Sequence, residues 1–370
     1  MKIAQDQEFY LTESLKQHPS AFIIFDKDLR IKWMNNSSKY IFTCDDEKDL
    51  KIRGVFSLGE SKKLEEVKIA SSFESNIEIQ LRNITFFLRS RVHEVPLEDN
   101  SSFFLLEVIT NSKESLEAMK GTIACIEHDR IDLAYQKQID LKSEKLVGLE
   151  ALLRLRDEDG NIIPNDKFIP LIEGESLFSL VVMASLEKLK EAFKLKKEFD
   201  MKGVTIYLNV SAHTAMQDNF TNIFIDFVKT LDLEPGELGL EITETAELAD
   251  VKKAGESFQK LKDVGIPLAI DDFGAGYSSL SYLRDLPVDS VKLDKVFAQT
   301  ISEKTTAELI KFVVSVCETL SLNMLGEGIE TDDQKEKFIK IGCPNGQGYL
   351  MHRPESVSYT HLTLPTICSV

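Results

Sequence analysis

Long apolar runs and patterned cysteines are both missing from this 370-residue sequence. No apolar run approaches the roughly 18 residues that a membrane-spanning helix needs. The polar start, MKIAQDQEFYLTESL, has no apolar signal-peptide core. The five cysteines form no C-x-x-C pair, which argues against a disulfide framework or a zinc site. We therefore predict a cytoplasmic protein with no membrane insertion.

Positive charge is also scarce. The chain has 44 Lys and Arg residues against 61 Asp and Glu residues, which gives a formal net charge of −17. Proteins that bind nucleic-acid polymers usually present a basic surface, so no such partner is predicted. A small phosphorylated substrate is still compatible with this composition, because bound divalent cations can reverse the local sign of the charge.

Residues 1–112 show the pattern of a small antiparallel α+β domain. AFIIFDKDLRIKWMN indicates two strands and a turn, and NIEIQLRNITFFLRSRVHEV and SSFFLLEVIT alternate apolar and polar residues. About five strands are expected. The stretch SLKQHPSAFIIFDKDLRIKWMNNSSKYIF resembles the opening helix, first two strands and Asn-containing turn of PAS sensor domains.

No sensor cofactor is readable in that region. It has no reactive-cysteine motif of the blue-light flavin type, and Cys44 is most simply a packing residue. His18 and His93 are not taken as haem ligands, and Trp33 is expected in the core. The signal that such a domain would detect is therefore left open.

A connecting helix is predicted over residues 113–127. Apolar side chains recur at helical spacing at Leu116, Met119, Ile123 and Ile126. Such a helix can belong to the core of the second domain or carry a signal between the domains. We favour a helix that does both.

Residues 128–355 alternate short strand-like runs with helical stretches. The runs are LAYQKQI, LVGLEALL, VTIYLNV, LGLEIT, PLAID, SVKLD, NMLGE and GYLM. This rhythm indicates parallel βα units, and eight runs predict a TIM-type (β/α)8 barrel. The segment 356–370, which contains SYTHLTLPTICSV, breaks the pattern and resembles a translated sequencing adaptor, so we predict a non-native tail there.

Polar residues fall where several of these strands end. They are Glu150, Asn209, Glu241, Asp271, Asp272, Lys292 and Glu327. A lone acid at such a place is more often a helix cap or a surface charge, and Asp-Asp before Gly is more often a turn. Seven matched positions instead favour one joint site, because barrel strands bring their carboxyl ends to one mouth. Carboxylates gathered there are costly to bury unless cations neutralise them.

Oxygen ligands of this kind suit Mg²⁺ or Mn²⁺, and no His or Cys joins the set to suggest zinc. One carboxylate of the Asp271–Asp272 pair can bridge two cations while the other holds one. Two cations roughly 3.5–4 Å apart can stabilise the attacking and leaving oxygens of a phosphoryl displacement. Lys292 could orient the nucleophilic water or neutralise charge that builds on phosphorus. Gly274 and Gly276 indicate a mobile loop without the spacing of a nucleotide-binding loop.

Residues from about 120 to 354 resemble the EAL domain, the cyclic di-GMP phosphodiesterase family. The motif that names the family is Glu150-Ala151-Leu152, and LNVS, LEITET, DDFGAGYSSLSYLRDLPVDSVKLDK, GEGIET and GQGYLMHRP follow in family order. The resemblance implies a barrel whose first strand is antiparallel. It also implies hydrolysis of cyclic di-GMP to linear pGpG with two Mg²⁺ or Mn²⁺ ions.

The resemblance further assigns roles to individual residues. The implied metal ligands are Glu150, Asn209, Glu241, Asp271, Asp272 and Glu327. Lys292 together with Glu327 would activate the water. Gln136, Arg154 and Gln347 would lie along the substrate, and Glu244 would anchor the glycine loop. Family members often form homodimers through the helix after that loop, here near Leu280–Leu283.

Four positions depart from the usual family pattern. Lys137 stands where a proline is usual, Gly326 where alanine is common, Ala275 where threonine is common, and Leu155 where an aromatic residue is frequent. None of them removes a ligand. We therefore expect an active phosphodiesterase regulated by its N-terminal domain. The alternative is a catalytically silent cyclic di-GMP receptor, and the complete ligand set argues against it.

Overall fold

The structure is a computed structural model. It describes residues 16, 21–41, 50–57, 73–81, 84–96, 102–108, 113–172, 177–216, 218–243, 251–275 and 280–356. The chain divides into two compact units, Met1–Ile131 with Leu155–Val181 and Asp132–Arg154 with Val182–Val370. The domain boundaries expected from the sequence stay a prediction.

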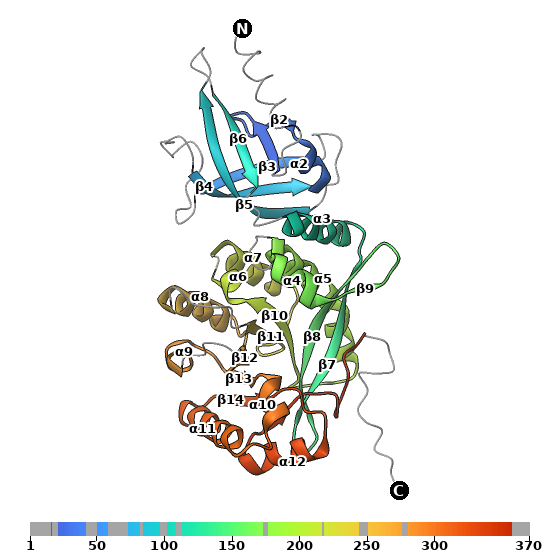
Figure 1. The fold of residues 1–370 in the computed structure, drawn as a ribbon, viewed down its shortest axis with the longest axis vertical. Coiled ribbons are helices and arrows are strands. Elements are labelled where there is room, and N and C mark those ends of the chain that lie inside the picture. The colour runs from blue at the N-terminus through green and yellow to red at the C-terminus, as the bar shows by residue number, and fades with distance from the viewer. Residues whose placement is uncertain are drawn as a thin grey trace. The chain divides into compact units, whose positions relative to one another are not determined.

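The first unit contains an antiparallel sheet (Figure 1). Its strands are β1 (Phe22–Phe25), β2 (Ile31–Met34), β3 (Leu50–Ser57), β4 (Phe73–Leu81), β5 (Ile84–Pro96) and β6 (Ser102–Val108), in the order β2-β1-β6-β5-β4-β3. The predicted antiparallel arrangement is confirmed, with six strands where about five were expected. The PAS assignment stays a prediction.

Two polar side chains form the turns at the start of this sheet. The Asp26 carboxylate accepts hydrogen bonds from the backbone N–H groups of Asp28 and Arg30, which closes the turn between β1 and β2. Asn35 is fully buried, and its Oδ1 accepts from the N–H groups of Phe22 and Ser38. Asn35 thereby begins helix α2 (Asn36–Ile41) and ties it to β1.

The helices and short strands of the intervening segment follow. They are α3 (Lys113–Glu127), β9 (Ile162–Ile163), α4 (Asn165–Ile172) and α5 (Leu177–Glu198). Helix α3 covers the residues of the predicted connecting helix, and Ile123 on it is buried. The signalling role of α3 stays a prediction.

The second unit holds a closed barrel. Its strands are β7 (Ile131–Asp140), β8 (Leu146–Arg156), β10 (Thr205–Ser211), β11 (Leu238–Thr243), β12 (Leu268–Phe273), β13 (Ser290–Leu293), β14 (Asn323–Gly326) and β15 (Asn345–Gly346). Neighbouring strands from β8 to β15 are parallel, whereas β7 pairs antiparallel with β15 and closes the ring against β8. The predicted barrel with an antiparallel first strand is confirmed. Its last strand is Asn345–Gly346, however, and the predicted run GYLM forms a turn just after it.

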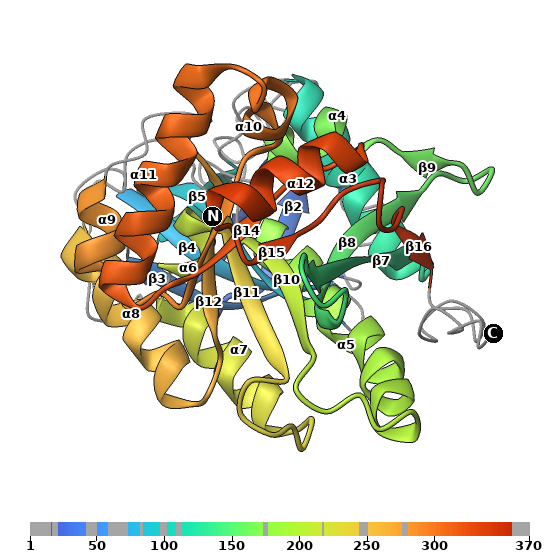
Figure 2. The same ribbon diagram turned by 90° about the horizontal axis from the view of Figure 1, so that it is seen from below.

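Amphipathic helices lie outside the barrel strands (Figure 2). They are α6 (Ala212–Ala215), α7 (Asp218–Lys229), α8 (Val251–Asp263), α9 (Leu280–Asp285), α10 (Lys295–Thr300), α11 (Lys304–Leu320) and α12 (Asp332–Ile341). Each of the longer ones buries an apolar stripe, with Phe224 of α7, Phe258 of α8 and Phe338 of α12 fully buried. Helix α12 begins with a capping box between Thr331 and Gln334 and ends at Gly342, whose φ of 104° few other residues adopt.

The last described element is β16 (Glu355–Ser356), which pairs antiparallel with β7. The predicted non-native tail, apart from Ser356, lies outside the described residues. No helix within the described part of the chain is long and apolar enough to cross a bilayer.

Packing explains one departure from the family pattern. A Cβ atom on Gly326 would stand 2.7 Å from Cε1 and 3.0 Å from Cζ of the Phe338 ring. Phe338 is fully buried, so its ring has little room to move away. Glycine at 326 and phenylalanine at 338 are therefore a matched pair.

We expect Gly326→Ala to lower the free energy of unfolding by about 1–3 kcal/mol, because the new methyl group overpacks the core. In a Phe338→Leu background the same change should cost much less, since the ring that it meets is gone. Urea denaturation of the four variants measures this coupling. Gly255→Ala in α8, where the nearest atom is 4.0 Å from the new Cβ, is the control and should not destabilise. Additive costs of Gly326→Ala and Phe338→Leu would contradict the pairing.

Candidate functional site

The strand ends of the barrel gather the polar residues singled out in the sequence. Asn209 on β10 lies opposite Glu241 on β11, and Tyr207 lies opposite Glu150 on β8. Lys292 is on β13, and Glu327 directly follows β14. The structure therefore brings the seven candidate residues to one mouth, while their individual roles stay predictions.

Lys292 is the hub of this cluster. Its side chain is 2% exposed, and its Nζ lies 2.6 Å from Glu241 Oε2 and 2.9 Å from Asp271 Oδ1. The same Nζ is 2.8 Å from Glu327 Oε1 and 3.6 Å from Glu150 Oε2. One ammonium group thus forms ion pairs with four carboxylates.

A β-bulge lets both adjacent aspartates reach the mouth. Successive side chains of a regular strand point to opposite faces. The pairing of β12 with β13 shifts between Ile270 and Phe273, and carboxylate oxygens of both Asp271 and Asp272 lie within 4.8 Å of one another and of Glu327. Asp272 has a φ of 51°, in the left-handed region. The bulge re-aims one side chain, as bulges beside active sites often do.

Amide groups hold Glu150 in place. Asn209 Nδ2 donates to Glu150 Oε1 over 2.8 Å, and Gln347 Nε2 donates to Glu150 Oε2. Gln347 Nε2 also reaches Gln136 Oε1 at 3.0 Å, and Gln136 Nε2 donates to the backbone oxygen of His352 at 3.0 Å. Gln136 and Gln347, predicted along the substrate, are both buried beside Glu150.

Gln138 is a site residue that the sequence reasoning did not single out. It lies on β7 two positions from Gln136, and its Nε2 donates to Glu241 Oε1 over 2.8 Å. Alternation along β7 places Gln136 and Gln138 on one face, and that spacing was the available signal.

Arg154 is half-buried, its Nη1 donates to the backbone oxygen of Leu153, and burial lowers its pKa. Glu244 and Gly276 lie outside the described residues. The predicted dimer segment forms α9, in which Leu283 is buried, and the dimer stays a prediction.

Burial and the neighbouring charges shift the pKa values of the clustered acids. Burial, followed by the neighbouring carboxylates, raises the pKa of Glu241 and of Asp271. Burial likewise raises the pKa of Glu327 to about 8. For Glu150 the burial effect is outweighed by the Lys292 charge and the amide hydrogen bonds, so its pKa is lowered. The acids drive the pKa of Lys292 well above its usual value against the effect of burial.

The donor set fits divalent cations. Carboxylate oxygens of Glu150, Glu241 and Asp271 lie within 4.8 Å of one another, and so do those of Asp271, Asp272 and Glu327. Asp271 belongs to both groups. An all-oxygen set of this kind suits a hard cation such as Mg²⁺ or Mn²⁺.

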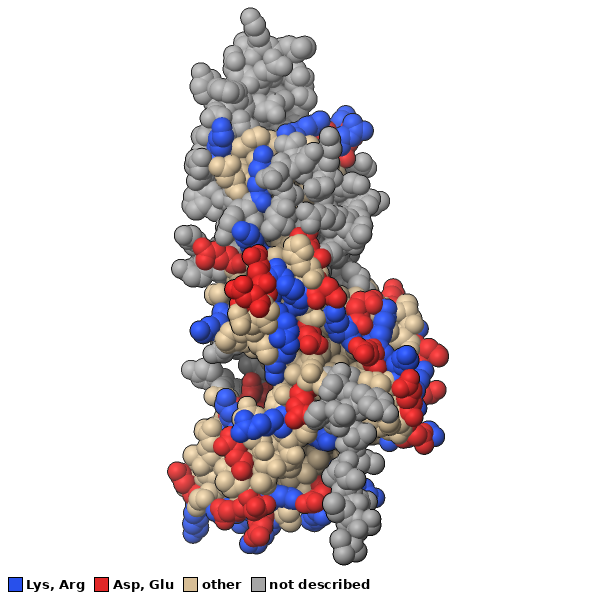
Figure 3. Space-filling view, turned by 90° about the vertical axis from the view of Figure 1, so that its right-hand side faces the viewer, with Lys and Arg blue, Asp and Glu red and all other residues tan. Residues whose placement is uncertain are grey.

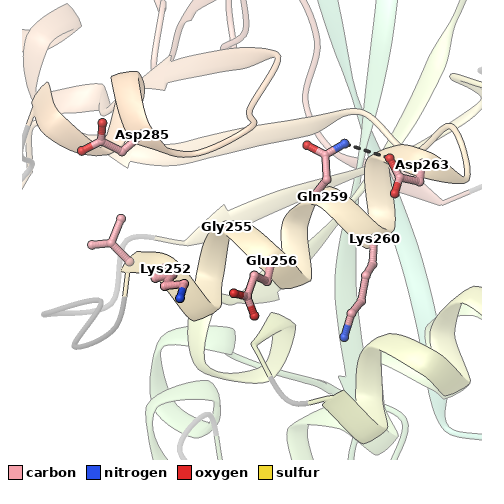
Figure 4. A pocket seen from close by; sticks show the side chains of 8 residues that line it. Lys252, Gly255, Glu256, Gln259, Lys260, Asp263 and Asp285 are labelled. Atoms are coloured by element: carbon pink, nitrogen blue, oxygen red, sulfur yellow. Dashed lines mark hydrogen bonds between the residues drawn. The ribbon is translucent and has the colours of Figure 1, made fainter.

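A surface hollow of the barrel unit lies away from this cluster. It has a volume of about 750 Å³ and runs along α8, lined by Val251, Lys252, Gly255, Glu256, Gln259, Lys260, Asp263 and Asp285 (Figure 4). Its charged side chains carry both signs and form no ligand cluster. On the face in Figure 3, described Lys and Arg side chains likewise lie among Asp and Glu side chains. The chemistry is therefore assigned to the barrel mouth.

Comparison with known proteins gives a consistent result. The EAL domain family matches residues 118–354. The signaling protein YkoW of Bacillus subtilis is 33% identical over 232 residues, which are 62% of this chain and 29% of YkoW. The cyclic di-GMP phosphodiesterase PdeA of Borreliella burgdorferi is 28% identical over 356 residues, which are 88% of this chain and 52% of PdeA.

A probable cyclic di-GMP phosphodiesterase of Escherichia coli, PdeB, is 32% identical over 254 residues, covering 68% of this chain and 47% of PdeB. The chain thus spans about half or less of the length of these relatives. Among solved structures, the PaMucR phosphodiesterase in complex with c-di-GMP is similar, with a TM-score of 0.58 and 29% identity. That likeness covers 65% of this chain and 98% of the other chain.

We expect Asp272→Asn to stabilise the metal-free protein above about pH 6. Burial and the charges of Asp271 and Asp294 raise the pKa of Asp272 from 3.8 to about 6. Between these values the folded state keeps a proton that the unfolded state releases, so the penalty grows with pH and is complete above about pH 6. Asparagine removes the penalty and tolerates the left-handed backbone.

The gain should be about 1 kcal/mol at pH 8, a modest figure because the side chain is partly exposed and screened. It should fade towards pH 4. Urea denaturation with a chelator present, at both pH values, checks the prediction. Asp272→Ala is the control, because it removes the charge but strains the backbone. A gain that is independent of pH would disprove the electrostatic explanation.

Proposed function

This chain belongs to the EAL domain family, and from that membership we propose that it hydrolyses cyclic di-GMP to linear pGpG. Three relatives or neighbours with matching segments are named for cyclic di-GMP cleavage or binding. The catalytically silent receptor is not favoured, because every acid that a metal site needs is present.

One observation carries the proposal. Five carboxylates surround the mouth, and four of them are ion-paired with Lys292, the one ammonium group that pairs with this cluster in the part of the chain that the structure describes. When all the acids are ionised, four negative charges are left without a counter-charge. Two divalent cations would balance them, and the two acid groups that share Asp271 offer two adjacent positions.

Glu150, Asn209, Glu241 and Asp271 would hold one cation, and Asp271, Asp272 and Glu327 the other. Such cations supply Lewis-acid stabilisation of the attacking and leaving oxygens of a phosphodiester. Their identity as Mg²⁺ or Mn²⁺ is part of the proposal.

The chain's own residues would orient the reaction. Lys292 donates to Glu327 over 2.8 Å, and this pair would fix and deprotonate the attacking water. Glu327 lies beside Asp271 at the mouth, where its carboxylate would accept the proton of the water. Arg154, half-buried at the end of β8, would meet a phosphate oxygen, and Gln136 and Gln347 would line the substrate path.

Regulation and assembly complete the proposal. The N-terminal sheet would act as a sensor domain, and two copies would pair through the region of α9. A cytoplasmic location suits a nucleotide second messenger. These statements extend the resemblance and depend on separate measurements of activity, mass and location.

Glu150→Gln should abolish turnover while the fold is retained, because the change removes a charged ligand but almost no volume. The assay incubates purified protein with cyclic di-GMP and Mg²⁺ or Mn²⁺ and follows pGpG by chromatography. Glu308→Gln on the exposed face of α11 is the matched control and should be fully active. Binding of cyclic di-GMP by the wild-type protein without any pGpG would instead establish the receptor alternative.

Lys292→Met separates the contribution of Lys292 to stability from its contribution to turnover. Removing the buried ammonium leaves the acids uncompensated, so the metal-free protein should lose about 3–5 kcal/mol of unfolding free energy. Added Mn²⁺ should restore more stability to this variant than to the wild type, while turnover stays lost. Urea denaturation with chelator and with Mn²⁺ measures both effects. A metal-free variant as stable as the wild type would show that Lys292 does not neutralise the cluster.

A further inference from the structure

Gln138 is buried at the inner end of the acid cluster without belonging to any ligand group. Its side chain is 4% exposed and reaches across the barrel from the antiparallel strand β7 to Glu241 on β11. The 2.8 Å hydrogen bond runs from Gln138 Nε2 to Glu241 Oε1. An uncharged amide in this place can orient a carboxylate but cannot neutralise it.

Glu241 depends on such a donor. It is fully buried, and its two oxygens are held by different groups, Oε1 by Gln138 and Oε2 by Lys292. Lys292 divides its charge among four carboxylates. If a cation replaces Lys292 at Oε2, Gln138 is the contact that still fixes the rotation of the carboxylate.

The neighbouring strand leaves the space that Gln138 occupies. A Cβ atom on Gly148 of β8 would overlap Gln138 Oε1 and lie 3.3 Å from Gln138 Cδ. Gly148 does not have a positive φ, so its backbone conformation does not require glycine. The close approach of the Gln138 side chain explains why a residue without a Cβ stands there. Gln138 and Gly148 therefore form a pair in which one side chain fills the space left by the other.

We propose that Gln138 is a positioning residue, which turns Glu241 so that its Oε2 faces the centre of the site, and that Gly148 provides the room for it. The proposal rests on the proposed function, in which the centre binds divalent cations. Partners that orient a metal ligand typically contribute 10- to 100-fold to metal affinity. A buried amide that merely satisfies the core would contribute to stability alone.

The test measures the dissociation constant for Mn²⁺ by isothermal titration calorimetry on the full chain. Gln138→Met keeps the length of the side chain and removes the donor. Gly148→Ala leaves residue 138 unchanged, but its new methyl group pushes the Gln138 side chain away from Glu241. Each should weaken Mn²⁺ binding by about 10- to 100-fold. The double variant should be no weaker than Gln138→Met, because both changes break the same contact.

Turnover adds a second readout. For Gln138→Met, kcat should return close to the wild-type value at saturating Mn²⁺, since the defect lies in holding the ion. Gln259→Met, on the exposed face of α8, is the matched control and should leave affinity and turnover unchanged (Figure 4). If Gln138→Met fails to fold, Gly148→Ala alone decides the question.

The outcomes are distinguishable. Wild-type protein that binds no Mn²⁺ overturns the proposed function itself. Wild-type protein that binds Mn²⁺, together with variants of unchanged affinity, overturns the role of Gln138 and leaves the proposed function standing. Losses of affinity that multiply in the double variant would overturn the pairing with Gly148.

Discussion

The structure depends on one electrostatic constraint: several carboxylates are buried around a single ammonium group. Lys292 makes close ion pairs with Glu241, Asp271 and Glu327, and its own side chain is only 2% exposed. Buried like charges of this density are expensive unless cations join them. The raised pKa values of the acids are the direct expression of that cost. The proposed divalent cations would offset this cost.

The barrel supplies the geometry through three local devices. Parallel strands bring their carboxyl ends to one mouth, which gathers residues that lie far apart in the sequence. The bulge at Asp271 and Asp272 turns two neighbours towards the same centre. The antiparallel first strand contributes amides, Gln136 and Gln138, in place of acids. Amides orient the carboxylates without adding charge, so the site gains order at no electrostatic cost.

The barrel and most of its site residues could be predicted from the sequence. The bulge, the role of Gln138 and the reason for Gly326 could not, because each depends on contacts that sequence patterns do not show. The strand ends that carry Glu150, Glu241 and Asp271 were visible because apolar runs stop at acids. The bulge was not, because regular alternation places adjacent residues on opposite faces. Gln138 was missed because a polar residue inside a strand gives no sign of its partner across the barrel. The reason for Gly326 was hidden too, since only the packing of the folded chain brings the Phe338 ring against it.

The central claim is that cations complete this cluster, and a crystal structure grown with Mn²⁺ tests it most directly. Anomalous scattering at the manganese edge locates each ion without reference to activity. The account predicts two peaks on either side of Asp271, with Lys292 drawn away from at least one of its four carboxylates. A map with no peak at the mouth, and with Lys292 still paired to all four acids, would contradict it.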